Sequence, residues 1–120
     1  MSPQRPYSHW RRAGDFVILS GQLGVLPDRA TPTFVDGGTA AQVRQALENA
    51  KAVLSEAGAT LGDVVKTSLF VLDMKDFAAC NEVWLEIFSD PLPTRTAVAV
   101  AELPLGAQAE VELWAYVPER

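Results

Sequence analysis

The sequence predicts an α+β domain in which a mixed sheet carries two helices on one face. Three observations lead to this fold class. Strand-like segments lie at both ends of the 120-residue chain, two segments of helical periodicity lie between them, and a further strand-like segment separates these two. A strand–helix–strand unit favours parallel pairing through a right-handed crossover, whereas the short links at both ends favour antiparallel pairing. We expect a single domain over residues 1–120.

The N-terminal third of the chain predicts an arm, a buried strand and a turn-rich connection. Residues 1–14 are polar and contain prolines, so we expect an irregular arm there. The segment FVILSGQ at 16–22 begins with a short continuous apolar run and is closed by Gly21, which is typical of a buried strand. Prolines, aspartates and glycines fill the following segment, where we expect a connection with a short strand near Phe34.

Two helices are predicted in the middle of the chain. A helix at about 40–57 is indicated by apolar residues at three- and four-residue steps, with Thr39 and Gln42 fitting a capping box and Gly58 a C-terminal stop. A second helix is expected at about 76–89, because apolar and aromatic residues recur there at the same steps. The apolar positions of the two helices are Val43, Leu47, Ala50, Val53, Leu54, Phe77, Cys80, Trp84 and Phe88.

Three further strands complete the predicted sheet. Residues 64–72 (VVKTSLFVL) are rich in β-branched side chains, and residues 95–101 and 109–117 are separated by the turn-like ELPLGAQ. The second helix must end before residues 90–91, Asp-Pro, because the residue before proline disfavours helical geometry. Two helices cover one face of the sheet and no element remains for the other. We therefore expect the chain to associate with further copies.

Composition excludes several classes of partner. The formal net charge is −5, and the ten Lys and Arg residues are scattered, with Arg11 and Arg12 as the one adjacent pair. Nucleic-acid binding normally requires clustered positive charge, so we expect no nucleic-acid partner. No apolar run approaches the roughly 18 residues of a membrane span, and the first residues lack the apolar core of a signal peptide. The single cysteine, Cys80, fits a reducing compartment, and we expect a cytoplasmic protein.

The sequence also lacks the common motifs of metal and nucleotide chemistry. His9 is the one histidine, so a His/Cys metal cluster is not expected, and no metal or organic cofactor is predicted. Neither phosphate-binding glycine motif occurs, and no G-x-S-x-G elbow is present. Cys80 lies between apolar helical positions and reads as a buried structural thiol, while His9 reads as a surface or interface residue.

Arg95 is a charged residue in a stretch of sequence that is otherwise uncharged. It stands at the entrance to a strand in the stretch PLPTRTAVAV, and no charged residue follows from Thr96 to Ala101. Small alanines at alternate positions leave space on one side, and a guanidinium there offers a planar fork suited to a carboxylate. Glu110 and Glu112 alternate with apolar residues on the last strand, a pattern that also fits an ordinary solvated surface.

These residues carry a resemblance to the reactive-intermediate deaminase family, RidA/YjgF. The segments RPYSHWRRAGDFVILSGQ, AAQVRQALENAKAVLSEAG, GDVVKTSLFVLDMKDFAACNEVW and PTRTAVAVAELPLGAQAEVE match in order from Pro6 to about residue 117. The most specific piece is Arg95 after a proline, then Leu103-Pro104, then Glu110 fifteen positions beyond the arginine. The resemblance implies a chorismate-mutase-like fold that forms trimers, with active-site clefts between subunits.

The resemblance further implies hydrolysis of reactive 2-enamino and 2-imino acids, of the 2-aminoacrylate type, to 2-keto acids and ammonia without a cofactor. By position, Arg95 matches the arginine that binds the substrate carboxylate and Glu110 matches the acid that positions water. We expect the backbone N–H of Ala97 to assist. The other residues that match the cleft lining are Tyr7, Ser20, Gly21 and Asn81.

Some positions depart from the family pattern. A cysteine common in the family is Ala97 here, the glycine before Pro-Tyr is Arg5, His9-Trp10 replace smaller residues, and Leu105 replaces a basic residue. These changes bear on which substrate fits. Two other interpretations stay open: a sibling enzyme dedicated to one pathway, and a non-catalytic trimer of the same fold that binds small carboxylates or has a regulatory role. Glu110 distinguishes enzyme from binder, because binding a carboxylate requires Arg95 alone.

Overall fold

The computed structural model describes residues 5–118, in which eight main elements follow one another as three strands, a helix, a strand, a helix and two strands. The strands are β1 (Trp10–Ala13), β2 (Phe16–Leu19), β3 (Gln22–Leu23), β4 (Val64–Val71), β5 (Thr94–Ala99) and β6 (Ala109–Tyr116), and the helices are α1 (Thr39–Glu56) and α2 (Phe77–Ile87). Short 3-10 turns precede β4, α2 and β6, at Leu61–Asp63, Met74–Asp76 and Pro104–Gly106.

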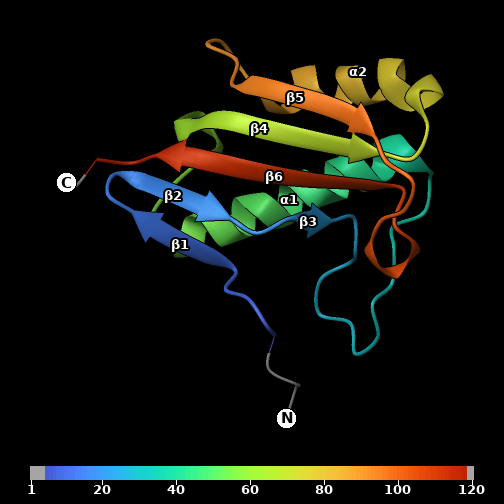
Figure 1. Ribbon diagram of the computed structural model, residues 1–120, viewed down its shortest axis with the longest axis horizontal. Coiled ribbons are helices and arrows are strands. Elements are labelled where there is room, and N and C mark those ends of the chain that lie inside the picture. The colour runs from blue at the N-terminus through green and yellow to red at the C-terminus, as the bar shows by residue number, and fades with distance from the viewer. Residues whose placement is uncertain (1–4, 119–120) are drawn as a thin grey trace.

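The strands form one mixed sheet, as the sequence predicts. Its order is β1-β2-β6-β4-β5, and β3 pairs with a further part of β6 (Figure 1). β4 and β5 are parallel and are joined through α2, whereas β6 runs antiparallel to β2, β3 and β4. β6 therefore lies inside the sheet, and β5 forms an edge.

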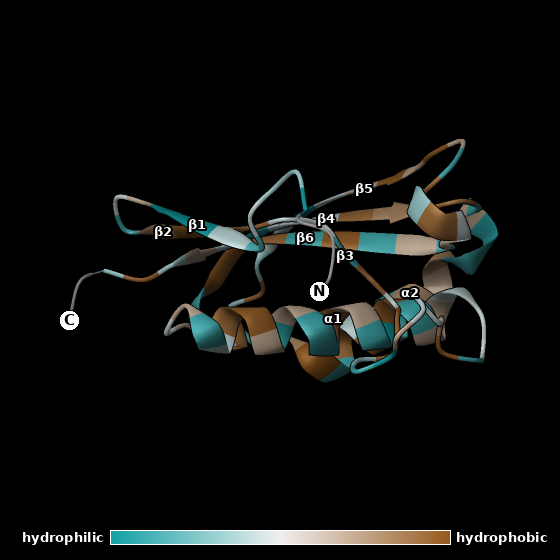
Figure 2. Ribbon diagram, turned by 90° about the horizontal axis from the view of Figure 1, so that it is seen from below, coloured by the Kyte–Doolittle hydropathy of each residue, from teal (hydrophilic) through white to brown (hydrophobic). Residues whose placement is uncertain are grey.

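Both helices pack on the same face of this sheet (Figure 2). β6 shows why: Ala109, Val111, Leu113 and Ala115 are buried beneath the helices, while the residues between them point to the other face. The apolar stripe of α1, which includes Leu47 and Leu54, closes the core from the opposite side. The two-layer arrangement that the sequence predicts is confirmed.

The second face of the sheet is left uncovered by the described residues, and it carries aromatic side chains. The Phe16 ring packs edge-on against the rings of Trp114 and Tyr116, with centroids 6.1 and 5.5 Å apart. Lys66 Nζ lies 5.2 Å from the centre of the Trp114 ring. Phe16 and Tyr116 remain exposed. Exposed rings in contact on a sheet face are typical of a surface that packs against another protein surface.

One prediction for the N-terminal arm is wrong. Residues 10–13 form β1, which pairs with β2 from Trp10 opposite Leu19 to Ala13 opposite Phe16. The two strands are joined by a two-residue turn at 14–15, where Gly14 has φ 60°. A glycine followed by an aspartate is a recognised hairpin signal, because the first turn position requires a positive φ. The predicted irregular residues 1–4 lie outside the described residues.

The strand predicted at 16–22 is interrupted. β2 ends at Leu19, and β3 begins at Gln22, so Ser20 and Gly21 lie at the break between two strands. The short strand expected near Phe34 is a single antiparallel bridge to Val25. The remaining strands lie where they are predicted, with β4, β5 and β6 each ending one or two residues earlier than expected.

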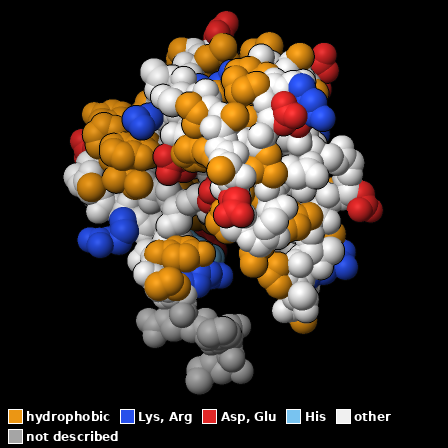
Figure 3. Space-filling model, turned by 45° about the vertical axis from the view of Figure 1, so that its right-hand side comes forward, with side chains coloured by type: hydrophobic (Ala, Val, Ile, Leu, Met, Phe, Trp, Pro, Cys, Tyr) orange, Lys and Arg blue, Asp and Glu red, His pale blue; other side chains and the backbone are white. Residues whose placement is uncertain are grey.

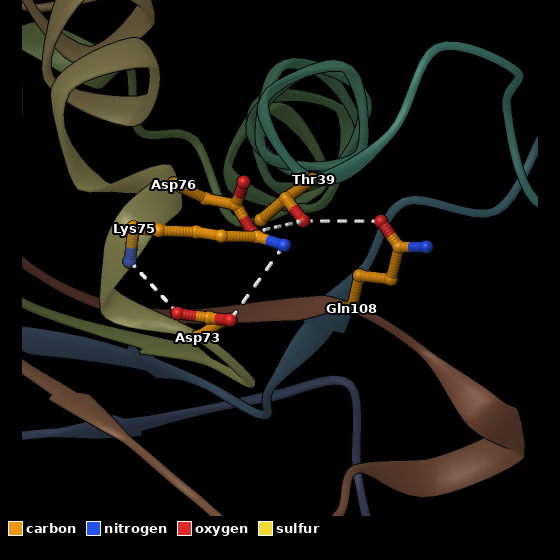
Figure 4. Close-up of polar contacts among 5 residues, drawn as sticks. All are labelled: Thr39, Asp73, Lys75, Asp76 and Gln108. Carbon is orange, nitrogen blue, oxygen red and sulfur yellow. Dashed lines mark hydrogen bonds and ion pairs between the residues drawn. The ribbon is translucent and has the colours of Figure 1, made fainter.

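The capping box predicted for α1 is also wrong. The residue before the helix is Gly38, and no side chain caps the first turn. The Thr39 side chain instead contacts two other elements: its Oγ1 lies 3.0 Å from Asp76 Oδ2 at the start of α2 and 3.0 Å from Gln108 Oε1 before β6 (Figure 4). Gln42 Oε1 accepts a 2.8 Å bond from the Gln108 backbone N–H. These contacts fix the entrance of β6 against both helices.

The signals that predict where the helices end agree with the structure. Gly58 has φ 76° and follows the end of α1, where its N–H donates to Ser55 O and the Ala59 N–H donates to Leu54 O. This pair of bonds is a Schellman motif, in which glycine supplies the left-handed residue. The α2 helix, predicted over 76–89, begins at Phe77 and ends at Ile87.

Candidate active site

Arg95 lies on β5 and points to the face of the sheet that the helices cover. Its cross-strand partner is Thr67, whose own partner on β6 is the buried Leu113. The guanidinium reaches α2, where Arg95 Nη2 donates a 2.9 Å hydrogen bond to Asn81 Oδ1. Because a guanidinium only donates, the amide of Asn81 must present its oxygen. Arg95 is thereby held at the edge of the molecule in a single orientation.

Two aromatic rings of α2 also flank the guanidinium. Arg95 Cζ lies 5.3 Å from the centre of the Phe77 ring and 5.1 Å from that of Trp84. Phe77, Asn81 and Trp84 are spaced by four and three residues, so they share one side of the helix. Cation–π contact with two rings restrains the cation without consuming its hydrogen-bond donors. The sequence prediction treats Trp84 as a core candidate only and gives Phe77 no role beyond the helix.

The Arg95 guanidinium keeps donors for a ligand. Among residues 5–118, Asn81 is its one hydrogen-bond partner, and the guanidinium carries five N–H groups. Arg95 and Asn81 line a pocket of about 340 Å³ between α2 and the segment that enters β5. A fixed guanidinium with free donors at a pocket wall is an arrangement that binds carboxylates.

The backbone of Ala97 presents its N–H to the same edge. Val100 N donates to Val71 O at 2.8 Å, so the N–H of residue 100 points toward β4. Alternate residues of a strand direct their N–H groups to opposite sides, and Ala97 is three positions earlier. Its N–H therefore points away from β4, toward the open edge of the sheet that Arg95 occupies. Edge strands offer such groups for pairing.

Glu110 lies on the other face of the sheet. It alternates with the buried Ala109 and Val111 on β6, and its partner on β4 is Phe70. The carboxylate lies directly over the backbone of Gly21: a Cβ built there would lie 2.8 Å from Glu110 Cδ and closer still to Glu110 Oε2. The glycine at the break between β2 and β3 therefore makes room for the acid.

A hollow of about 410 Å³ surrounds the Glu110 carboxylate. In the view of Figure 3, acidic side chains lie near the middle of the surface, with hydrophobic side chains to either side. Ser20 holds the arm against the hollow, because its Oγ donates to Ser8 O at 2.6 Å and its N–H donates to His9 O at 3.0 Å. The residues that line the hollow are Tyr7, Ser20, Gly21, Pro104, Glu110 and Glu112.

Burial raises the pKa of the Glu110 carboxyl above its ordinary value, and the neighbouring Glu112 carboxylate raises it further. Both causes act on the charged form: partial removal from water disfavours it, and a like charge disfavours it again. A carboxyl whose pKa moves toward neutrality can accept a proton and return it during one reaction. Glu112, which the alternating pattern of β6 assigns to a solvated surface, shares the hollow with Glu110.

The predicted site residues therefore fall into two groups that do not meet within one chain. Arg95, Asn81 and Ala97 lie on or beside β5, on the helix-covered side, whereas Tyr7, Ser20, Gly21 and Glu110 lie on the open side. β4 separates β5 from β6 in the sheet. We call these groups the arginine half-site and the glutamate half-site. Each group holds only some of the residues that the sequence analysis predicts for the site.

The remaining candidate residues have simpler surroundings. Cys80 is fully buried in α2, and burial raises the pKa of its thiol, which suits the structural role predicted for it. His9 is partly buried where the arm meets β2. Within residues 5–118, no three or more His, Cys, Asp or Glu side chains gather closely enough to hold a metal ion. None of the helices described there has the length and apolarity to cross a membrane.

Sequence comparison connects the chain to a family of small proteins. The family model described as "Endoribonuclease L-PSP" matches residues 1–117. A RutC family protein of Pyrococcus horikoshii is 43% identical over 114 residues, which are 95% of this chain and 89% of the relative. A protein of Dermatophagoides farinae named 2-iminobutanoate/2-iminopropanoate deaminase is 42% identical over 110 residues, 92% of this chain and 84% of the relative.

Structural comparison gives the same result. The crystal structure of RidA from an Antarctic Psychrobacter species matches with a TM-score of 0.88 and 40% identity, covering 97% of this chain and 92% of that one. Escherichia coli TdcF, crystallised with bound serine, matches with a TM-score of 0.83 and 36% identity, covering 95% and 90%. The α+β architecture is thus that of RidA proteins, as the resemblance predicts.

Proposed function

The chain belongs to the endoribonuclease L-PSP (RidA/YjgF) family, and on this premise we propose that it hydrolyses reactive 2-enamino and 2-imino acids to 2-keto acids and ammonia. A relative that is 42% identical carries the name 2-iminobutanoate/2-iminopropanoate deaminase. The observation that carries the proposal is that one chain presents two separate groups: a guanidinium held by Asn81 with free donors, and a carboxyl whose pKa is raised.

The active site would be completed between subunits of a homotrimer. The arginine half-site of one subunit faces the glutamate half-site of the next, so that the uncovered sheet face becomes an interior surface. The exposed Phe16–Trp114–Tyr116 cluster supports burial of that face, because large apolar side chains in water favour association. Neither half-site alone holds both a carboxylate anchor and an acid–base group.

The reaction needs orientation more than a strong nucleophile, because a protonated imine is already electrophilic. Arg95 binds the substrate carboxylate through paired hydrogen bonds, with the Ala97 N–H beside it, and this converts a chance encounter into an oriented one. The Glu110 carboxylate takes a proton from a water molecule while the oxygen of that water forms a bond to the imine carbon. The C=N double bond becomes a single bond, which gives a neutral carbinolamine.

Glu110 then returns that proton to the amine. The C–N bond breaks with its electron pair on nitrogen, which releases ammonia, and the hydroxyl group of the carbinolamine becomes the keto group as it gives its proton to the Glu110 carboxylate. Ammonia takes up this proton and leaves as ammonium, so that Glu110 is ionised again. Iminium plus water thus gives a 2-keto acid plus ammonium, with no redox change. A carboxyl of ordinary pKa would return the proton poorly near neutral pH, whereas burial and Glu112 make Glu110 a better donor.

The family description also names RNA cleavage, which suits this chain less well. The net charge is −5, and among the described residues the hollow beside the proposed acid is lined by two glutamates, Glu110 and Glu112, and by no Lys or Arg. Like charges repel a polyanion, and RNA binding normally requires clustered positive charge.

The proposal is tested by following imine loss. An amino-acid oxidase generates 2-imino acids in the presence of semicarbazide, and an active protein lowers the yield of the trapped imine. We expect Glu110→Gln to lose the rate but to retain 2-ketobutyrate binding, and Arg95→Ala to lose both. Glu48→Gln and Arg29→Ala, at exposed positions outside both half-sites, are the matched controls. If Glu110→Gln consumes the imine as fast as the unchanged chain, the acid–base role given to Glu110 is wrong. If the unchanged chain binds 2-ketobutyrate but does not accelerate imine loss, only the non-catalytic binder remains.

A further inference from the structure

The pocket beside Arg95 has a polar end and an apolar remainder. It is lined by Asn81, Trp84, Leu85, Leu92, Pro93 and Arg95, and its volume is about 340 Å³. Asn81, Trp84 and Leu85 come from one side of α2, since they are three and four residues apart, and the rest come from the segment that leads into β5. The hydrogen-bonded pair of Arg95 and Asn81 forms the polar end.

Two leucines on the pocket wall are exposed. Leu85 is 65% exposed and Leu92 is 47% exposed, although both are large aliphatic side chains. Exposed leucines elsewhere on a surface need no explanation, but here two of them converge on one concavity beside a guanidinium with free donors. An apolar group placed in this pocket would remove both from water, and this is the interaction that apolar pockets use to hold ligands.

We propose that this pocket is the subsite for the substrate side chain and that it selects 2-imino acids with uncharged aliphatic or aromatic side chains of several carbons. The inference rests on the proposed function, because it takes Arg95 as the carboxylate anchor. With the carboxylate on the guanidinium, the side chain lies along Trp84, Leu85, Leu92 and Pro93. The smallest imino acid, derived from alanine, leaves most of this surface uncovered.

The size and charge of the pocket set the class of side chain. The pocket, at about 340 Å³, is much larger than a single methyl group needs, so a branched aliphatic group or a ring fits in it. Arg95 is the one charged residue among those lining it. A basic side chain would be repelled by the guanidinium, and an acidic one would compete with the substrate's own carboxylate for it.

The proposal predicts how binding and rate change with side-chain length. One additional methylene in an apolar pocket is worth about tenfold or more in specificity. We therefore expect kcat/KM to be at least about tenfold higher for the leucine-derived imine than for the alanine-derived imine. The same order should hold for equilibrium binding of the corresponding keto acids, 4-methyl-2-oxopentanoate and pyruvate, measured by calorimetry.

The test compares Leu92→Ser and Leu85→Lys with the unchanged chain. We expect Leu92→Ser to lower the leucine-to-alanine ratio of kcat/KM by about tenfold. Leu85→Lys should lower it as well and raise the relative rate on the glutamate-derived imine, because the new ammonium attracts the second carboxylate. Leu72→Ser removes a similarly exposed leucine, 41% exposed, from outside this pocket and should keep the ratio.

Each outcome separates this inference from the proposed function. If Leu92→Ser lowers kcat/KM for both imines by the same factor, Leu92 does not contact the side chain and the inference is overturned. Equal binding of pyruvate and 4-methyl-2-oxopentanoate to the unchanged protein overturns it too. If no imine is consumed faster but the binding preference is present and is lost in Leu92→Ser, the deaminase proposal fails and the side-chain pocket stands.

Discussion

Replacing Gly21 with alanine should displace the Glu110 carboxylate while leaving the sheet intact. The three atoms nearest to a Cβ built at Gly21 all belong to the Glu110 side chain: Oε2, Cδ and Cγ. No backbone atom is among them, so the clash is relieved by rotating one side chain. The substitution therefore perturbs the position of the acid rather than the fold.

The size of the displacement follows from the geometry. The new Cβ would lie 2.8 Å from Glu110 Cδ. Carbon atoms in contact prefer separations of about 3.5 Å or more, so the carboxyl must retreat by at least about 0.7 Å. A misplacement of about 1 Å can reduce a rate about 100-fold. We expect kcat to fall by about 10- to 100-fold, which corresponds to about 1.4–2.7 kcal/mol in the activation free energy.

The assay is the trapped-imine assay with the alanine-derived imine, run across a range of substrate concentrations so that kcat and KM are separated. Because Arg95 is untouched, kcat should fall by a larger factor than KM rises. Gly62→Ala is the matched control, since the nearest atom to its Cβ would be Thr60 Oγ1 at an ordinary 3.6 Å. A Gly21→Ala protein with undiminished kcat would refute the role given to the position of Glu110.

Three further results are expected. Glu112→Gln removes a like charge and lowers the pKa of Glu110, so the acidic limb of the pH–kcat profile should move to lower pH, while Glu48→Gln leaves the profile in place. Asn81→Leu removes the acceptor that holds Arg95 and should raise KM by about tenfold or more, since a hydrogen bond to a charged group contributes about 1.5–3 kcal/mol. An unaltered KM would show that Asn81 does not position Arg95 for binding. Glu110→Gln should raise Tm at neutral pH. A carboxyl whose pKa is raised by folding destabilises the folded state above that pKa, and the substitution removes this carboxyl. The gain in Tm should vanish as pH falls below the unfolded pKa of about 4.3.

Periodicity predicted the elements well where burial is one-sided. The stripe of α1 and the alternation of β6 each mark the face that the core occupies, and both elements lie within one or two residues of their predicted bounds. β1 was missed because its burial is weak, although the Gly14-Asp15 turn was a usable signal. The Thr39 capping box failed because Asp76 and Gln108, which are distant in sequence, compete for the hydroxyl.

The division of the site between two faces could not be predicted from the sequence. Which face a strand residue occupies depends on register, and a shift by one residue exchanges the faces. Only the pairing of Arg95 with Thr67 and of Glu110 with Phe70 shows that these two side chains point to opposite sides. The sequence pattern pointed to Arg95 as a carboxylate-binding candidate, whereas the role of Glu110 came from the resemblance to RidA/YjgF proteins.

The aromatic support of Arg95 was hidden for a different reason. Phe77 and Trp84 repeat at helical spacing, as core residues also do. A sequence does not reveal that an arginine from a strand will contact both rings. An arginine that enters an otherwise uncharged strand was the one available hint.

The most direct test of a site shared between subunits is complementation. Arg95→Ala and Glu110→Gln proteins, each inactive alone, are unfolded together in equal amounts and refolded. In a closed ring, a site is complete when its arginine half comes from a Glu110→Gln subunit and its glutamate half comes from an Arg95→Ala subunit. Each half is supplied by the suitable subunit about half of the time, so random mixing should restore about one quarter of the activity of the unchanged protein. If the mixture stays as inactive as its components, the two half-sites do not meet across a subunit boundary.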